Sequence, residues 1–119
     1  MEALAAGAVV LVRFPFSDLS QTVLRPAVVL ADAGRNDFVL CQLTSNRYAD
    51  AKAIEVTDTS FHQGSLDRIS YARPGKLFTA SRKLFDRQAG RLMPEVHRAI
   101  VDSVVSLLQE QLQPQADPK

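Results

Sequence analysis

In the first half of the chain, apolar residues either alternate with polar ones or form short runs, and both patterns predict β-strands. The run 26–30 is continuously apolar and begins with a proline, which a strand tolerates at its first position, so it predicts a central strand. Turn-forming residues fill 33–37, and residues 38–44 follow as a further strand. Residues 9–16 predict the first strand, because these side chains share one face of an extended segment: Val10, Val12, Phe14 and Phe16.

The middle of the chain is also rich in strand formers. Residues 53–56 predict a short strand, and the polar residues 57–65 predict a loop. The stretch 69–79 is interrupted by Pro74-Gly75. That pair is typical either of a hairpin turn or of a bend in one long strand, and the pattern does not choose between them.

Helical periodicity dominates the end of the chain. Ser81 can cap a short helical turn over residues 82–85, and residues 87–92 predict a last strand. Pro94 suits the first turn of a helix. The spacing of three and four residues that predicts an amphipathic helix is made by Val96, Ile100, Val104, Leu107, Leu108 and Leu112.

The overall composition is that of a globular domain. The chain has 119 residues, of which 46% are hydrophobic, and we expect a single domain over residues 1–112 with a flexible tail over residues 113–119. Many short strands and one helix predict a mainly β fold, a small bent sheet or barrel. No apolar stretch approaches the roughly 20 residues that span a bilayer, and the N-terminus lacks the basic region of a secretory signal, so we expect a cytoplasmic protein with no membrane contact.

Few residues offer the usual hydrolytic or metal chemistry. Cys41 lies within a predicted strand, where a buried hydrophobic role is favoured over a nucleophilic one. His62 and His97 could form an acid and base pair, but nothing in their spacing supports it, and solvated surface histidines are the favoured interpretation. A glycine-rich phosphate loop and a carboxylate cluster are both lacking, so we expect neither a metal site nor a cofactor.

Arginines stand out because of where they are placed. Arg25 and Arg73 each precede a proline, which holds them extended, and Arg25 ends a polar loop predicted over residues 15–24. A guanidinium matches phosphodiester oxygens, although from the sequence alone a plain surface arginine beside a strand is the favoured interpretation. Net charge is only +1, yet residues 68–98 hold eight basic and two acidic residues, which indicates a solvated face or a polyanion site. Three aromatic residues could stack unpaired bases or pack in the core: Tyr48, Phe61 and Tyr71.

The segments 9–20 (VVLVRFPFSDLS) and 24–30 (LRPAVVL) resemble the opening of the MazF/PemK toxins of bacterial type II toxin–antitoxin systems. Residues 43–45 (LTS) and 76–79 (KLFT) are similar to two further segments of that family, so the likeness covers residues 7–112. It implies an SH3-like barrel with a C-terminal helix, a homodimer and a cognate antitoxin. It also implies an endoribonuclease that cuts single-stranded RNA through attack by the 2′-hydroxyl, without metal or cofactor.

The resemblance assigns catalytic roles to Arg25 and Thr44. An acidic residue that the family commonly has five positions before the arginine is replaced by Ser20, and Asp18 is the substitute proton acceptor that we expect. RNA contacts are expected from the loop, from the residue after Thr44 and from the basic segment: Phe16, Ser17, Ser20, Gln21, Ser45, Arg73 and Lys76.

Two other classes of function remain open from the sequence. A toxin of the CcdB type has the same barrel but poisons gyrase, and its target-binding end resembles a Trp-bearing terminal helix, whereas this chain has no Trp. A non-catalytic SH3-like binding module is the third possibility, and the presence of both Arg25 and Thr44 argues against it.

Overall fold

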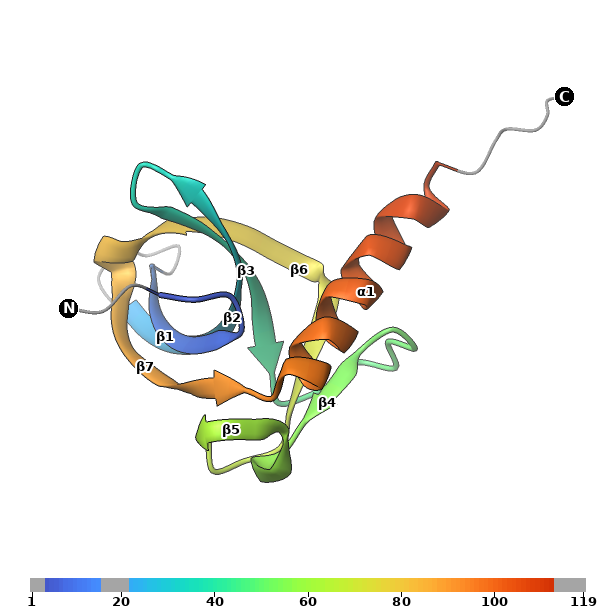
Figure 1. Cartoon of the computed structure of the whole chain (residues 1–119), viewed down its shortest axis with the longest axis horizontal. Coiled ribbons are helices and arrows are strands. Elements are labelled where there is room, and N and C mark those ends of the chain that lie inside the picture. The colour runs from blue at the N-terminus through green and yellow to red at the C-terminus, as the bar shows by residue number, and fades with distance from the viewer. Residues whose placement is uncertain (1–3, 16–21, 113–119) are drawn as a thin grey trace, which may run out of the picture.

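The protein is a curled antiparallel β-sheet with one helix packed against it (Figure 1). The structure, a computed structural model, describes residues 4–15 and 22–112, so the predicted tail over 113–119 lies outside the described residues. Its strands run in the sheet order β4-β6-β3-β2-β1-β7-β5. The elements are β1 (Ala8–Pro15), β2 (Thr22–Gly34), β3 (Asp37–Thr44), β4 (Ile54–Val56), the 3₁₀ turn η1 (Asp58–Ser60), β5 (Phe61–Gly64), β6 (Ser70–Ser81), the 3₁₀ turn η2 (Arg82–Leu84), β7 (Phe85–Leu92) and α1 (Pro94–Glu110).

Both faces of the central strands are buried, which explains their continuous apolar runs. One face of β1, β2 and β3 fills the inside of the curled sheet with Val10, Val29 and Leu40, and Phe14 and Phe85 pack against this cluster. The opposite face packs under the helix and forms one buried cluster with Ile100 of α1; its members from the sheet are Val9, Val28, Cys41 and Leu43. The predicted central position of the second strand and the mainly β fold are confirmed.

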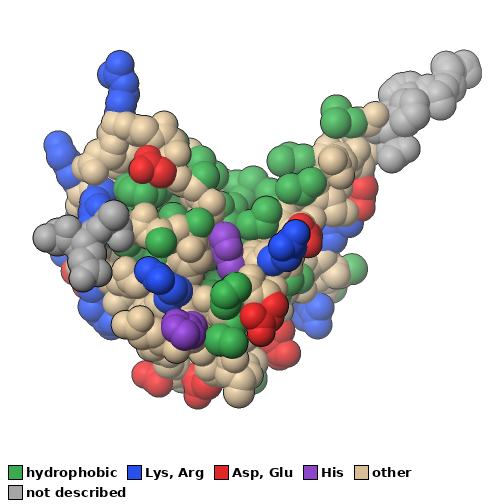
Figure 2. Space-filling view, viewed as in Figure 1, with side chains coloured by type: hydrophobic (Ala, Val, Ile, Leu, Met, Phe, Trp, Pro, Cys, Tyr) green, Lys and Arg blue, Asp and Glu red, His purple; other side chains and the backbone are tan. Residues whose placement is uncertain are grey.

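Helix α1 is confirmed, with Pro94 at its first turn. Ile100 and Val104 are buried against the sheet. Beyond them the helix continues past the barrel, as Figure 1 shows, and Figure 2 shows apolar side chains gathered between the barrel and the projecting helix. The loop before β4 is tied to the helix by Ser103, whose hydroxyl donates to the Lys52 carbonyl oxygen at 2.7 Å. In the part of the chain that the structure describes, no helix is long and apolar enough to cross a membrane.

Two expected loops contain strand structure. Strand β2 begins at Thr22, so residues 22–24 pair with β1 and are not loop. Residues 57–65 contain η1 and β5, and β5 pairs with β7. Strand β5 lies at the edge of the sheet beside β7, and three of its four residues are exposed. Because its sequence is therefore mostly polar, it does not show the apolar pattern that predicts a strand.

The Pro74-Gly75 pair bends one long strand and does not form a hairpin turn. In the pairing of β3 with β6, Leu43 lies opposite Ala72 and Cys41 lies opposite Leu77. Residues 73–76 therefore form a bulge opposite a single residue of β3, at a position where a proline costs no ladder hydrogen bond. Pro74 is fully buried, so tertiary packing and not turn formation decides its conformation.

His97 is not the solvated surface histidine that the sequence suggested. It is half-buried on α1 and packs against Gly7, and its buried Nε2 has no hydrogen-bond partner in the described segments 4–15 and 22–112. Burial lowers the pKa of His97 below its usual value of 6.5, because desolvation penalises the charged form.

We expect this histidine to make the fold weaker in acid. When the pKa of a histidine is lower in the folded state, the free energy of unfolding is unaffected at pH values above the pKa of the unfolded state. Below about pH 6.5 the free energy of unfolding decreases, because the unfolded chain takes up the proton more readily than the folded one. Unfolding of the wild type and of His97→Gln, measured from pH 8 to pH 5, checks this. The free energy difference between wild type and variant should shift against the wild type as pH falls, and a constant difference would contradict it.

Candidate active site

A cavity of about 670 Å³ opens where β2 begins and β3 ends. Strands β1, β2, β3 and β6 and the loops after β3 and before β6 contribute its walls. The lining residues are Phe14, Leu24, Arg25, Pro26, Gln42, Leu43, Thr44, Ser45, Tyr48, Arg68, Ser70, Arg73 and Lys76. Four of them are basic, and none of these described lining residues is acidic, so the cavity favours an anionic ligand.

Strand register brings Arg25 and Thr44 to the same place. Ala27 of β2 is paired with Gln42 of β3 in an antiparallel ladder. Continued by two residues, that register sets Arg25 opposite Thr44 on one face of the sheet. Arg25 is half-buried within β2 and paired with Val12 of β1, so it is a strand residue and not the exposed loop arginine expected from the sequence.

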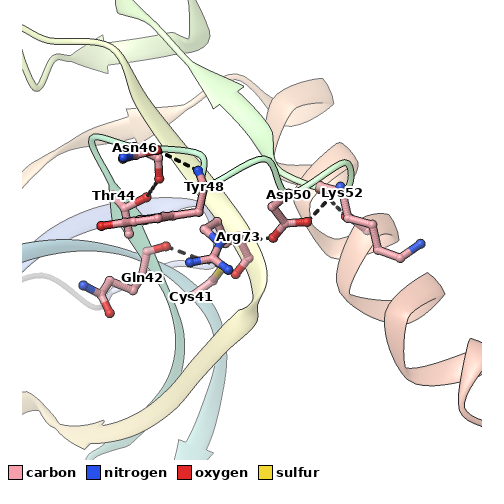
Figure 3. Close-up of polar contacts among 9 residues, drawn as sticks. Cys41, Gln42, Thr44, Asn46, Tyr48, Asp50, Lys52 and Arg73 are labelled. Carbon is pink, nitrogen blue, oxygen red and sulfur yellow. Dashed lines mark hydrogen bonds and ion pairs between the residues drawn. The ribbon is translucent and has the colours of Figure 1, made fainter.

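The hydroxyl of Thr44 begins a short chain of hydrogen bonds into the next loop. Thr44 Oγ1 donates to the Asn46 carbonyl oxygen at 2.7 Å, and Asn46 Oδ1 accepts from the Tyr48 backbone N–H at 2.7 Å (Figure 3). The single proton of this hydroxyl is therefore already donated to Asn46. Toward the cavity, Thr44 Oγ1 can only accept a hydrogen bond.

Arg73 enters the cavity from the bulge of β6. Its Nε donates to Asp50 Oδ2 at 3.1 Å, and its Cζ lies 4.9 Å from the centroid of the Tyr48 ring. The pKa of Asp50 is lowered, first by the hydrogen bond from the Lys52 backbone N–H and further by Arg73, so this carboxylate stays charged and holds the guanidinium in place. In Figure 3 the Arg73 side chain lies between Tyr48 and Asp50.

Several predicted residues meet here. Ser45 and Lys76 line the cavity together with Arg25, Thr44 and Arg73. The remaining predicted site residues lie outside the described residues: Phe16, Ser17, Asp18, Ser20 and Gln21.

Sequence reasoning missed other lining residues. Arg68 reaches the cavity from the loop before β6, Ser70 from the first position of β6, and Gln42 from β3. Only the position of Arg68 in the basic segment could have indicated a role. Of the eight basic residues in that segment, three line the cavity, so most of the segment is a surface elsewhere on the molecule.

The other aromatic and nucleophilic candidates pack within the protein and do not line the cavity. Phe61 packs against the core beneath α1, and Tyr71 is half-buried with the Arg47 guanidinium 5.7 Å from its ring centroid. Burial raises the pKa of the Cys41 thiol to about 12, which excludes a thiolate nucleophile at neutral pH and confirms its role as a small hydrophobic residue. Within the described ranges, no group of three His, Cys, Asp or Glu side chains is placed to hold a metal ion.

A comparison with known protein families identifies the family to which this chain belongs. Residues 5–112 match the model of the family described as PemK-like, MazF-like toxins of type II toxin–antitoxin systems. The chain belongs to this family. No curated protein sequence is similar enough to be counted as a relative of this PemK/MazF-like chain.

Solved structures share the fold of this PemK/MazF-like chain. A MazE–MazF structure from Deinococcus radiodurans is 19% identical and covers 92% of this chain and 98% of its own, with a TM-score of 0.74. An endoribonuclease in complex with its cognate antitoxin from Mycobacterial species is 15% identical and covers 92% and 96%, with a TM-score of 0.68. The Mycobacterium tuberculosis toxin MazF-mt6 is 14% identical and covers 86% and 96%, with a TM-score of 0.67.

Proposed function

We propose that this PemK/MazF-like protein is the toxin of a type II toxin–antitoxin system and cuts single-stranded RNA within the cavity that holds Arg25 and Thr44. The observation that carries the proposal is the position of Arg25 beside Thr44 in a cavity with three further basic side chains: Arg68, Arg73 and Lys76. Such a lining suits a phosphodiester strand, and the strand-end position keeps the site open to a long substrate.

The reaction is a transesterification within the RNA strand. The 2′-hydroxyl oxygen attacks the adjacent phosphorus, its proton passes to an acceptor, and the bond from phosphorus to the 5′-oxygen breaks. The leaving oxygen takes up a proton, so the products carry a 2′,3′-cyclic phosphate and a 5′-hydroxyl. Arg25 neutralises the charge that develops on the phosphorane oxygens, and its fixed fork of donors is oriented before the substrate arrives.

Thr44 orients Arg25 in this mechanism. A non-bridging phosphate oxygen can only accept a hydrogen bond, and the Thr44 hydroxyl already donates its proton to the Asn46 carbonyl. The free lone pairs of Thr44 Oγ1 suit a guanidinium N–H, and the register of β2 and β3 favours that partner. Thr44 would contact phosphate directly only after giving up its bond to Asn46.

The proton acceptor is a separate group. Arginine stays protonated in proteins and is a poor base, and the described lining residues include no carboxylate. We assign this role to Asp18 of the segment between β1 and β2. That segment connects β1 to β2, and each of these strands contributes a residue near the connection, Phe14 and Leu24, to the cavity lining. The segment therefore begins and ends beside the cavity, which supports the assignment.

The partners in this proposal are a cognate antitoxin and a second copy of the chain. Similar structures contain MazF with MazE, and an endoribonuclease with its antitoxin. The basic cavity would attract an acidic antitoxin segment, which would then compete with RNA. The projecting end of α1 and the turn after it offer apolar side chains for a protein contact, because three of them are exposed: Val105 and Leu108 of the helix, and Leu112 beyond it.

The test is RNA cleavage without metal. Purified protein is incubated with a mixed single-stranded RNA pool in EDTA, and the ends of the fragments are mapped and their termini identified. We expect cuts at a short sequence, a 2′,3′-cyclic phosphate at each 3′-end, and no cutting of an all-deoxy strand of the same sequence, because that strand has no 2′-hydroxyl. Activity that disappears in EDTA, or cleavage of the deoxy strand, would refute the mechanism.

A further inference from the structure

Tyr48 has an unusual position for a large aromatic side chain. It is 60% exposed and lines the cavity that holds Arg25 and Thr44. Phe14, the other aromatic residue among the described lining residues, packs instead against Phe78, with ring centroids 4.9 Å apart, and against the interior of the barrel. Tyr48 is therefore the lining aromatic residue whose ring is open to a ligand.

The backbone at Tyr48 is held in a conformation that bulky residues avoid. Tyr48 has φ +54° and Ala49 has φ +57°, both in the left-handed region. The surrounding hydrogen bonds fix it there, since Asn46 Oδ1 accepts from the Tyr48 N–H and the Arg47 carbonyl accepts from the Asp50 N–H at 2.9 Å. Strain of this kind persists where the surroundings enforce it, and it is concentrated at functional sites.

One side of the Tyr48 ring is supported by a fixed cation. The Arg73 guanidinium lies 4.9 Å from the ring centroid, within the range of a cation–π contact, and Asp50 holds that guanidinium through Nε. Arg73 is also fixed at its backbone, because its carbonyl oxygen accepts from the Cys41 thiol at 3.3 Å. Figure 3 shows the ring edge-on with Arg73 beside it. The ring is thus a rigid platform with a supported side and an exposed side.

We propose that Tyr48 is a substrate-binding residue that stacks the base of one of the two nucleotides joined by the bond that is cut. This inference rests on the proposed function and deepens it. A phosphate bound at Arg25 and Thr44 brings its two nucleosides into the same cavity. Tyr48 is close to that phosphate position, because Asn46 is hydrogen-bonded both to the Thr44 hydroxyl and to the Tyr48 backbone N–H. Every unpaired base has a π-face, and stacking on an aromatic side chain is how single strands are commonly held.

The test measures stacking directly and without cleavage. The substrate is a single-stranded RNA with 2′-deoxyribose at the mapped cleavage position, carrying 2-aminopurine on either side of the scissile phosphate in turn. Stacking on Tyr48 quenches 2-aminopurine fluorescence at one of these two positions when wild-type protein binds. Tyr48→Asn removes the ring with a residue that tolerates the left-handed region, so the variant is expected to fold at least as stably as wild type.

We expect Tyr48→Asn to lose the quenching and to raise KM for cleavage of the all-ribose strand by about tenfold to a hundredfold, with kcat changed little. Tyr48→Phe keeps the ring and should retain both the quenching and the KM. Ala49→Gly is the second matched control, because it relieves the neighbouring left-handed strain and keeps the ring, so cleavage should be unchanged.

Three outcomes would contradict the proposal, and they can be told apart. Quenching and KM that survive in folded Tyr48→Asn would overturn the role of Tyr48 while leaving the ribonuclease intact. A loss of melting temperature in Tyr48→Asn and Tyr48→Phe alike, with quenching unchanged in the protein that remains folded, would show that the side chain is only structural. A wild-type protein that cuts no RNA would instead refute the proposed function itself.

Discussion

Arg25→Ala is expected to lower kcat/KM for RNA cleavage by about a thousandfold or more. The guanidinium is the charge placed beside Thr44, and removing a group that stabilises developing charge on phosphorus or an oxyanion costs on the order of a hundredfold to a hundred-thousandfold. Arg25→Lys should recover only a small part of the rate, because an ammonium keeps the charge but loses the planar fork of donors. Cleavage rates with a mapped RNA substrate, together with growth after expression, measure the effect.

Arg35→Ala is the matched control for this loss. Arg35 is exposed in the turn between β2 and β3, at the far end of the same ladder from Arg25, and its removal lowers the net charge by the same amount. It should cut RNA at nearly the wild-type rate. Because Arg25 is half-buried in a strand, melting of the Arg25 variants must be measured as well. A folded Arg25→Ala protein that cleaves as fast as wild type would end the assignment of Arg25 as the catalytic residue.

Gly64→Ala is expected to destabilise the fold by about 3 kcal/mol or more, which corresponds to a melting temperature roughly 10 °C lower. Gly64 has φ +79°, and an added Cβ would lie 2.2 Å from the Ala89 carbonyl oxygen and 2.6 Å from the Gly90 Cα. Both atoms belong to the backbone of β7, so they can move away only if the pairing of β5 with β7 opens. Thermal or denaturant unfolding measures the change.

Gly34→Ala separates the two causes of this loss. Gly34 has φ +87°, close to the value at Gly64, but an added Cβ there meets nothing within 4 Å. It should therefore show only the backbone cost of the left-handed region, about 1 to 2 kcal/mol. Equal destabilisation by the two substitutions would mean that the contact with β7 contributes nothing.

The local pattern of the sequence determined most of the elements and the fold class. Alternation and short apolar runs predicted the strands β1, β2 and β3, and the spacing from Pro94 onward predicted helix α1, because one buried face requires that periodicity. The resemblance of the segments around Arg25 and Thr44 identified the family, which the match over residues 5–112 confirmed. Strand β5 escaped because its residues are mostly exposed, so no apolar alternation marks it.

Only the tertiary structure shows how Arg25 and Thr44, which the family resemblance had paired as catalytic residues, come to meet. The turn pairs Gly34 with Asp37, and that register continued without interruption would set Arg25 opposite Asn46. Two register shifts between β2 and β3 move the ladder by two residues and bring Thr44 there instead. Bulges depend on how the whole sheet curls, which no local pattern encodes.

The same is true of the platform beside the site. Tyr48 and Arg73 lie 25 positions apart, in an irregular loop and a strand bulge, where neither helical nor strand periodicity applies. Their contact exists because Asp50 holds the guanidinium and because Asn46 holds the loop in the left-handed region. The sequence by itself determined that Thr44 lies at the end of a strand and that Arg25 is constrained by the proline that follows it. Long-range packing determined which residues lie next to them, because side chains distant in sequence are brought together only by the folded chain.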